Sequence, residues 1–176
     1  MIRPRGFPGV AFGESDDGDP RSSVDALRHF CGSLGVPQRW AFVDQVHGSA
    51  VVYATEPGNL GDADGIVTIT PGLPIAIATA DCVPIALVGE HSVAIVHAGW
   101  RGVASGVVRE AVRVISDSED SVVAAAVGPH IGPCCYEVGA EVVEAVGGFA
   151  STTTDGGLSV DLGASVSAQL PDVPIT

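Results

Sequence analysis

The chain has 176 residues, of which 46% are hydrophobic and 16% charged, and its net charge is −13. This composition is too apolar for a disordered chain, and glycine and proline interrupt the apolar runs too often for a membrane-spanning helix. All eight basic residues are arginines. They do not cluster into a basic stripe, so no nucleic-acid partner is expected. No charged, apolar leader is found before a small-residue cleavage site, which predicts a cytoplasmic protein.

The first regular element expected along the chain is a helix over residues 23–34. Apolar side chains recur at helical spacing between Val24 and Leu34. Ser22 or Ser23 is suited to cap the start of this helix, and Gly35 is suited to end it.

Most of the following segments have the composition of β-strands. Strands are expected at residues 40–46, 50–54, 65–69, 74–78, 83–88, 93–97 and 121–127. Residues 58–64 are expected to form a loop. The runs between residues 74 and 97 are almost continuously apolar, which is typical of strands that are covered on both faces.

Helices are expected at residues 102–115, 136–146 and 159–170, from the spacing of their apolar positions. No internal repeat and no linker divides the chain. The sequence therefore predicts one α/β domain over residues 1–176, with sheets covered by helices.

Three metal-binding residue types stand at or near the ends of expected strands, namely His47, Cys82 and His97. One thiolate and two imidazoles suit zinc, and three protein ligands leave a fourth position open for water or substrate. The alternative is that each histidine is half-buried and hydrogen-bonded, and that Cys82 packs as a small apolar side chain.

Two further residues near this trio are candidates for chemistry. Arg101 lies between Gly99 and Gly102, and is suited to recognise phosphate or carboxylate. Its alternative role is a surface ion pair. Asp81 is a candidate general acid or a hydrogen-bond partner of a ligating histidine, and alternatively a turn residue.

The second dense segment is residues 128–139, where two Gly-Pro steps favour a rigid loop before a helix. Three roles are open to His130, Cys134 and Cys135: further metal ligands, lining of the pocket, or packing within the loop. We assign them to the pocket lining. Adjacent cysteines pair poorly with each other, so reduced thiols are expected.

Five motifs in a fixed order resemble the YfiH-type laccase-domain family, which has also been labelled as polyphenol or multicopper oxidase. They are QVHG, DADGIVT, TADCVPI, HAGWRG and GPHIGPCCYEVG. The resemblance extends from about Trp40 to about Gly139. It implies an α/β/β/α layered fold with mixed β-sheets sandwiched by helices. It also implies one zinc ion held by His47, Cys82 and His97.

The activity that the resemblance implies is phosphorolysis of purine nucleosides, with deamination of adenosine and cleavage of methylthioadenosine. The expected partners are therefore purine nucleosides and phosphate. Catalytic roles are expected for Asp81, as a proton shuttle, and for Arg101, as a phosphate ligand. Residues of the matching motifs are expected to contact substrate, namely Gln45, Gly99, Trp100, His130, Cys134 and Tyr136.

Two features depart from the family pattern. Family members usually have an arginine near the N-terminus that helps to build the site, where this chain has Phe12-Gly13-Glu14-Ser15. They also continue into a segment with a further cysteine and an aromatic–arginine motif, whereas this chain stops at Thr176. The sequence is thus expected to be a short form or a truncated one.

Three other interpretations of the His47, Cys82 and His97 trio are considered. A copper-dependent polyphenol oxidase needs several coppers, but the chain has only five histidines, and its single methionine is Met1. A cysteine hydrolase would use Cys82 as nucleophile and His97 as base. A non-enzymatic binding protein would use the same residues only for packing.

Overall fold

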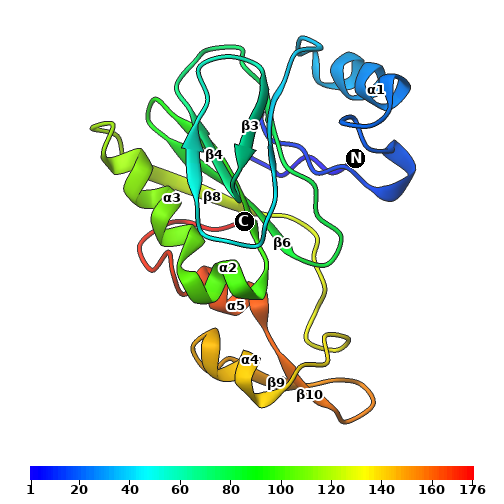
Figure 1. The fold of residues 1–176 in the computed structure, drawn as a ribbon, viewed down its shortest axis with the longest axis vertical. Coiled ribbons are helices and arrows are strands. Elements are labelled where there is room, and N and C mark those ends of the chain that lie inside the picture. Colours follow the sequence, from blue (N-terminus) through cyan, green and yellow to red (C-terminus); the bar gives the residue numbers. More distant parts are fainter.

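The computed structural model describes residues 1–176 as a mixed α/β fold, which confirms the expected fold class (Figure 1). Its largest sheet has five strands in the order β2-β4-β7-β6-β8. Their bounds are β2 Val51–Tyr53, β4 Gly65–Thr68, β6 Val83–Gly89, β7 Val93–Ala98 and β8 Val122–Val127. All neighbours pair antiparallel except β2 and β4, which are parallel.

A second, smaller sheet lies against one face of the first. Its order is β3-β1-β5, all parallel, with β1 at Ala41–Asp44, β3 at Gly58–Asp62 and β5 at Ile75–Ala76. Buried apolar residues from both sheets, including Val43 and Ile66, form the cluster between them. This packing of sheet on sheet brings the end of β1 close to the ends of β4 and β7.

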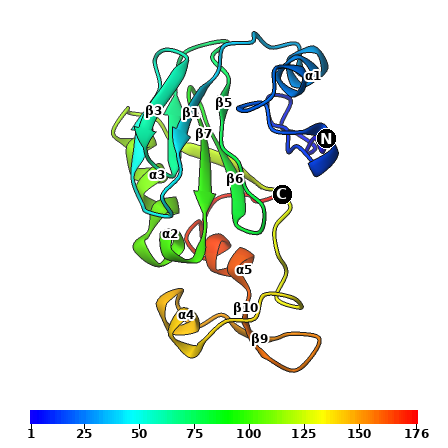
Figure 2. The ribbon, with the colours of Figure 1, turned by 45° about the vertical axis from the view of Figure 1, so that its right-hand side comes forward.

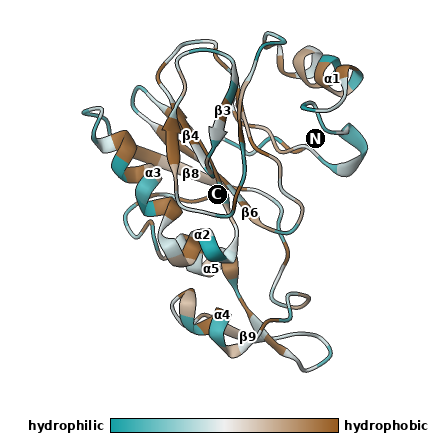
Figure 3. Ribbon diagram, viewed as in Figure 1, coloured by the Kyte–Doolittle hydropathy of each residue, from teal (hydrophilic) through white to brown (hydrophobic).

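Helices cover the other face of the five-stranded sheet (Figures 1 and 2). They are α2 Trp100–Ser105, α3 Val107–Ser116 and α5 Leu162–Ser167. Fully buried residues such as Leu87, Val96 and Ile115 form the main core between these helices and the sheet. The strands of this sheet are accordingly apolar, while α3 has one apolar and one polar side (Figure 3).

Two smaller parts lie away from the sheets. Helix α1 (Val24–Leu34) lies beyond the β5 side of the smaller sheet, and α4 (Ala140–Ala145) lies beside the hairpin of β9 (Ala150–Thr152) and β10 (Leu158–Val160) (Figure 2). A 3₁₀ turn, Ser15–Asp17, precedes α1. No helix combines the length and apolarity that a membrane crossing requires.

The local signals around α1 predicted its bounds correctly. The Ser23 side chain accepts a hydrogen bond from the Ala26 N–H, and Gly35 ends the helix with a left-handed backbone at φ 69°. The buried face is formed by Ala26, Phe30 and Cys31, whereas Val24 is exposed. The expected strands that became β1, β2, β4, β6, β7 and β8 are also confirmed, while β5 is shorter than expected.

The expected loop at residues 58–64 is wrong, because this segment contains β3. Its glycines, asparagine and aspartates have low strand propensity. The backbone nevertheless pairs with β1, where the Gly58 N–H donates to the Trp40 carbonyl and the Ala63 N–H donates to the Asp44 carbonyl. Tertiary pairing therefore overrides composition here.

The three expected helices after residue 100 have different bounds in the structure. The helix expected at 102–115 is two helices, because Gly106 has φ 83° and ends α2 before α3 begins. In the segment expected as helix 136–146, only Ala140–Ala145 is helical. In the segment expected as helix 159–170, the first residues belong to β10, and Asp161 caps α5 by accepting the Ala164 N–H.

Candidate metal centre

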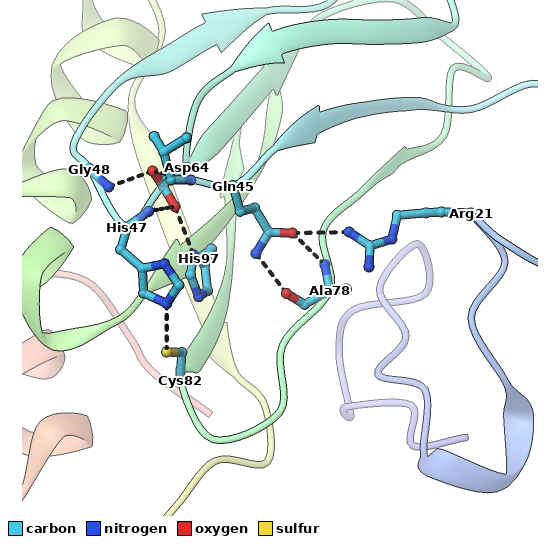
Figure 4. A network of polar contacts seen from close by, with 9 residues as sticks. Arg21, Gln45, His47, Gly48, Asp64, Ala78, Cys82 and His97 are labelled. Atoms are coloured by element: carbon cyan, nitrogen blue, oxygen red, sulfur yellow. Dashed lines mark hydrogen bonds and ion pairs between the residues drawn. The ribbon is translucent and has the colours of Figure 1, made fainter.

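The three expected ligands come together from three separate segments (Figure 4). His47 follows β1, Cys82 immediately precedes β6, and His97 is the penultimate residue of β7. Their ligand atoms all lie within 4.8 Å of one another, and the Cys82 Sγ lies 3.9 Å from the His47 Nε2. The β6–β7 register, in which Pro84 pairs with His97, holds the last two side chains at the same end of the sheet.

One buried carboxylate, that of Asp64, organises the loop that carries His47. It accepts hydrogen bonds from three consecutive backbone N–H groups, at Val46 (3.3 Å), His47 (3.0 Å) and Gly48 (2.6 Å). His47 has φ 59°, which is unusual for a non-glycine residue and has to be stabilised by its surroundings. The carboxylate supplies that stabilisation through charge-assisted hydrogen bonds.

The same carboxylate orients the second histidine. The His97 Nδ1 lies 2.8 Å from the Asp64 Oδ1, and both side chains are buried. With Nδ1 occupied as a donor, the Nε2 of His97 is left as the ligating atom, which is the usual arrangement of a carboxylate behind a metal-bound histidine. The two histidine rings stand nearly perpendicular, with centroids 4.7 Å apart.

Two glycines allow the backbone to approach this trio. A Cβ at Gly99 would lie 2.9 Å from the His47 Cδ2 and 3.0 Å from the Cys82 Sγ. A Cβ at Gly102 would lie 2.8 Å from the Gly48 carbonyl oxygen. The start of α2 therefore packs against the ligands at a distance that only glycine permits.

The electrostatics around Cys82 favour a cation beside it. Burial raises the pKa of the Cys82 thiol, and the charges of Asp81 and Asp64 raise it further. A bound cation reverses this balance, since a coordinating thiol loses its proton. Two imidazoles, one thiol and a carboxylate behind one histidine fit a zinc ion well.

A cavity of about 640 Å³ opens directly beside the trio. Its lining residues come from β1, from the segment before β6, from His97 in β7 and from the region before α1: Arg21, Val43, Asp44, Gln45, His47, Ala78, Thr79, Ala80, Asp81, Cys82 and His97. Arg21 is the only basic residue among them apart from the two histidines. The cavity thus places one guanidinium and two carboxylates next to a three-ligand centre.

Arg21 is held in place by the residue two positions before it. The Asp19 carboxylate accepts hydrogen bonds from the Arg21 Nε (3.1 Å) and Nη2 (3.0 Å), and this interaction lowers the pKa of Asp19. The Arg21 Nη1 lies 3.4 Å from the Gln45 Oε1 (Figure 4). This weak contact leaves Nη1 with hydrogen-bonding capacity toward the cavity.

Gln45, an expected substrate ligand, lines the cavity but uses its amide to join two segments. Its Oε1 accepts the Ala78 N–H at 2.8 Å, and its Nε2 donates to the Ala78 carbonyl at 2.6 Å. The side chain therefore continues the pairing of β1 with the segment after β5. Asp81, the expected proton shuttle, is exposed at the rim of the cavity, and the carboxylate that contacts His97 is Asp64 instead.

The other residues expected at the site lie outside the lining of this cavity. The Arg101 guanidinium stacks over the Trp100 ring at 4.4 Å from its centroid, and Trp100 packs against the main core. The His130 Nδ1 lies 2.8 Å from the Gly128 carbonyl oxygen. Cys134 is exposed.

Tyr136 lies near enough to Cys82, Asp81 and Arg101 for their charges to affect its pKa. Burial raises the pKa of Tyr136, and so does Cys82, while Arg101 lowers it and Asp81 raises it. The loop that precedes Tyr136 is joined to the site, because the Ile131 N–H donates to the Asp81 carbonyl at 3.0 Å. Residues 128–136 are therefore joined to the segment that carries Asp81 and Cys82, but none of them lines the cavity.

The sequence reasoning missed two residues of this centre, Asp64 and Arg21. Asp64 is the second aspartate of the DADGIVT motif, but no spacing or pattern around it indicates contact with the expected ligands. Arg21 lies in the Asp-Pro-Arg-Ser turn before α1, where no pattern in the sequence indicates contact with residues near position 45.

Comparison with known proteins places these features in a family. Residues 7–176 match the family model described as multi-copper polyphenol oxidoreductase laccase. A Mycobacterium tuberculosis protein named purine nucleoside phosphorylase is 38% identical over 170 residues, covering 90% of this chain and 68% of the relative. An Escherichia coli protein, purine nucleoside phosphorylase YfiH, is 41% identical over 132 residues, covering 73% of this chain and 54% of the relative.

The fold has a counterpart among solved structures. The crystal structure of YlmD from Geobacillus stearothermophilus superposes with a TM-score of 0.78 at 28% identity, covering 90% of this chain and 70% of that one. The chain thus spans about two thirds of the mycobacterial relative and about half of the E. coli one.

Proposed function

Because the chain belongs to the multi-copper polyphenol oxidoreductase laccase family, we propose that it carries the metal centre of a zinc-dependent purine nucleoside phosphorylase. The observation that supports this proposal most directly is the convergence of His47, Cys82 and His97 beside a cavity of about 640 Å³. A volume of this size suits a ligand as large as a nucleoside. The relatives that share the family are named for this activity.

In this reaction a phosphate oxygen bonds to the sugar carbon while the bond from that carbon to the purine nitrogen breaks. Arg21 would hold the phosphate, since it is the only arginine that lines the cavity. A guanidinium recognises phosphate through paired hydrogen bonds, and Asp19 keeps this one oriented. Arg101, which we expected in this role, is instead stacked over Trp100.

The departing purine needs a proton, and Asp81, which lines the cavity, would relay it. Gln45 holds the segment that leads to Asp81 through its two hydrogen bonds to Ala78. A zinc ion held by the three ligands would supply a Lewis acid next to the substrate. The Asp64 carboxylate would keep His97 in the tautomer that such an ion requires.

We extend the proposal to deamination of adenosine and phosphorolysis of methylthioadenosine, which need the same cavity for the purine. Deamination consumes water and no phosphate, so the two reactions are separated by their phosphate dependence. The four free cysteines fit a reducing cytoplasmic compartment, which we propose as the location.

The test compares the chain with its Cys82→Ala variant. Metal content is measured by elemental analysis, and release of free base from inosine and adenosine is measured with and without phosphate. We expect about one zinc per chain, phosphate-dependent release of base, and loss of both in the variant. Cys135→Ser, which alters an exposed thiol outside the cavity, is the matched control and should retain both. Full zinc content and full turnover in Cys82→Ala would refute the proposal.

Copper is the alternative that the family description raises. The structure contains one cluster of side chains capable of holding a metal, namely His47, Cys82 and His97. No methionine lines the cavity beside it. Of the remaining histidines, the His29 Nε2 lies 3.1 Å from an Asp17 carboxylate oxygen and the His130 Nδ1 lies 2.8 Å from a backbone carbonyl oxygen. A multicopper centre needs more imidazoles than this site offers, so the ligand set favours a single zinc.

A further inference from the structure

Two adjacent thiols are exposed in the loop that follows β8. Cys134 and Cys135 lie in a turn closed by the hydrogen bond from the Cys135 N–H to the Gly132 carbonyl, at 3.0 Å. Both side chains are exposed and neither is in a disulfide. Their sulfur atoms are 2.7 Å apart. The backbone therefore presents two thiols to solvent in direct contact with each other.

The turn is anchored on both sides, so the two sulfurs are held together. The Cys134 carbonyl accepts hydrogen bonds from the Thr154 N–H (2.8 Å) and hydroxyl (3.1 Å). The Ser159 hydroxyl donates to the Pro133 carbonyl at 2.5 Å. Such restraint gives one thiol a high effective concentration at the other, which favours reaction between them over reaction with a second external molecule.

We propose that Cys134 and Cys135 are an oxidative modification site, at which exchange with a small-molecule disulfide forms a reversible disulfide between the two residues. The Cys134 thiolate attacks one sulfur of the small disulfide, which forms a mixed disulfide and releases one small thiolate. The Cys135 thiol then gives up its proton and attacks the Cys134 sulfur, which releases the second small thiol. Two protein thiols are oxidised and one small disulfide is reduced to two thiols.

The two sulfurs interact directly, and either atom can be the donor. The interaction with Cys134 raises the pKa of Cys135, with a smaller contribution from burial. We therefore assign the second attack to Cys135; since the thiolate is the nucleophile, the same exchange with the two roles reversed gives the same disulfide.

The product is strained, and the strain makes it reversible. Consecutive Cα atoms are about 3.8 Å apart, whereas disulfides usually join Cα atoms about 4.4–6.8 Å apart. A strained and exposed disulfide is easily reduced, which is the behaviour of regulatory bonds and not of structural ones. The site is separate from the metal ligands, so its existence does not depend on the proposed function.

The test uses the reduced, full chain with oxidised glutathione as the probe, followed by alkylation and peptide mass mapping. We expect two of the four thiols to be lost, and the peptide that contains both residues to be two hydrogens lighter and free of glutathione. Dithiothreitol should restore both thiols. In Cys135→Ser the second step is blocked, so glutathione should remain attached to Cys134. In Cys134→Ser no neighbouring thiol remains to resolve the mixed disulfide, so glutathione should remain attached to Cys135.

A second probe tests the same pair without oxidation. Phenylarsine oxide bonds two neighbouring thiols through its arsenic and loses its oxygen as water. One equivalent should bind to the wild-type chain and to Cys82→Ala, and none should bind to either serine variant. Stable glutathione on the wild-type peptide, a disulfide to Cys82, or arsenical binding that persists in both serine variants would overturn the proposal. Should the serine variants fail to fold, the wild-type peptide map alone decides between these outcomes.

Discussion

The substitution Asp64→Asn tests the structural logic of the metal centre, because it removes one charge and leaves the shape of the side chain nearly unchanged. In the wild-type chain, Oδ1 accepts hydrogen bonds from the His47 N–H and the His97 ring, and Oδ2 accepts them from the N–H groups of Gly48 and Val46. An asparagine can present only one acceptor oxygen. Its amide NH₂ would then face two backbone donors.

The expected cost can be worked out from these four hydrogen bonds. If the asparagine oxygen keeps its contacts with His47 and His97, the donors of Gly48 and Val46 lose their acceptor. A buried donor without a partner costs about 1–3 kcal/mol, so the two together should lower the free energy of unfolding by about 2–6 kcal/mol. Because His97 also loses its carboxylate, zinc affinity should fall about 10–100-fold.

The assay measures both quantities on the same preparations. Urea unfolding gives the free energy of unfolding, and competition with a chromophoric chelator gives the zinc affinity. Asp62→Asn is the matched control, since it makes the same chemical change at an exposed carboxylate two residues away, and both quantities should stay at the wild-type level. Wild-type zinc affinity in Asp64→Asn would show that Asp64 does not orient His97 as the geometry implies.

Three further predictions concern other parts of the chain. Burial raises the pKa of Asp120, but three backbone N–H groups that donate to its carboxylate outweigh burial and bring the pKa to about 2 from 3.8. This carboxylate should therefore contribute about 2 kcal/mol above pH 4 and lose it as the pH falls toward 2, so Asp120→Asn should flatten that part of the urea-unfolding profile. Gly99→Ala should reduce zinc affinity measured by chelator competition, because the new Cβ would lie 2.9 Å and 3.0 Å from two ligand side chains. Gly9→Ala is the control, since Gly9 has open space around it, and it should leave the affinity unchanged. Gly106→Ala should lower the thermal midpoint by the equivalent of about 1 kcal/mol or more, since Gly106 has φ 83°. Gly32→Ala inside α1 meets no neighbour and should raise the midpoint. Equal midpoints for the two variants would contradict the strain argument.

Local chemistry along the sequence was enough to identify several features of this protein. Ser23 and Gly35 mark the two ends of α1 because capping depends on hydrogen bonds within a few residues. The apolar runs of β6, β7 and β8 likewise identify buried strands. The residue types of the ligand trio indicate a candidate metal centre, since thiolate and imidazole donors bind metals whatever the fold.

Tertiary structure decided the features that depend on residues far apart in the chain. Segment 58–62 became β3 only because β1 lies beside it, and its composition opposes that outcome. Asp64 acquired its role through His97, 33 residues later, and Arg21 reached the cavity through Gln45, 24 residues later. Hydrogen bonds of this kind require the packed sheets, and no periodicity or capping signal in the local sequence encodes them. The chemistry of the centre is thus readable from residue types, whereas its geometry exists only in the folded chain.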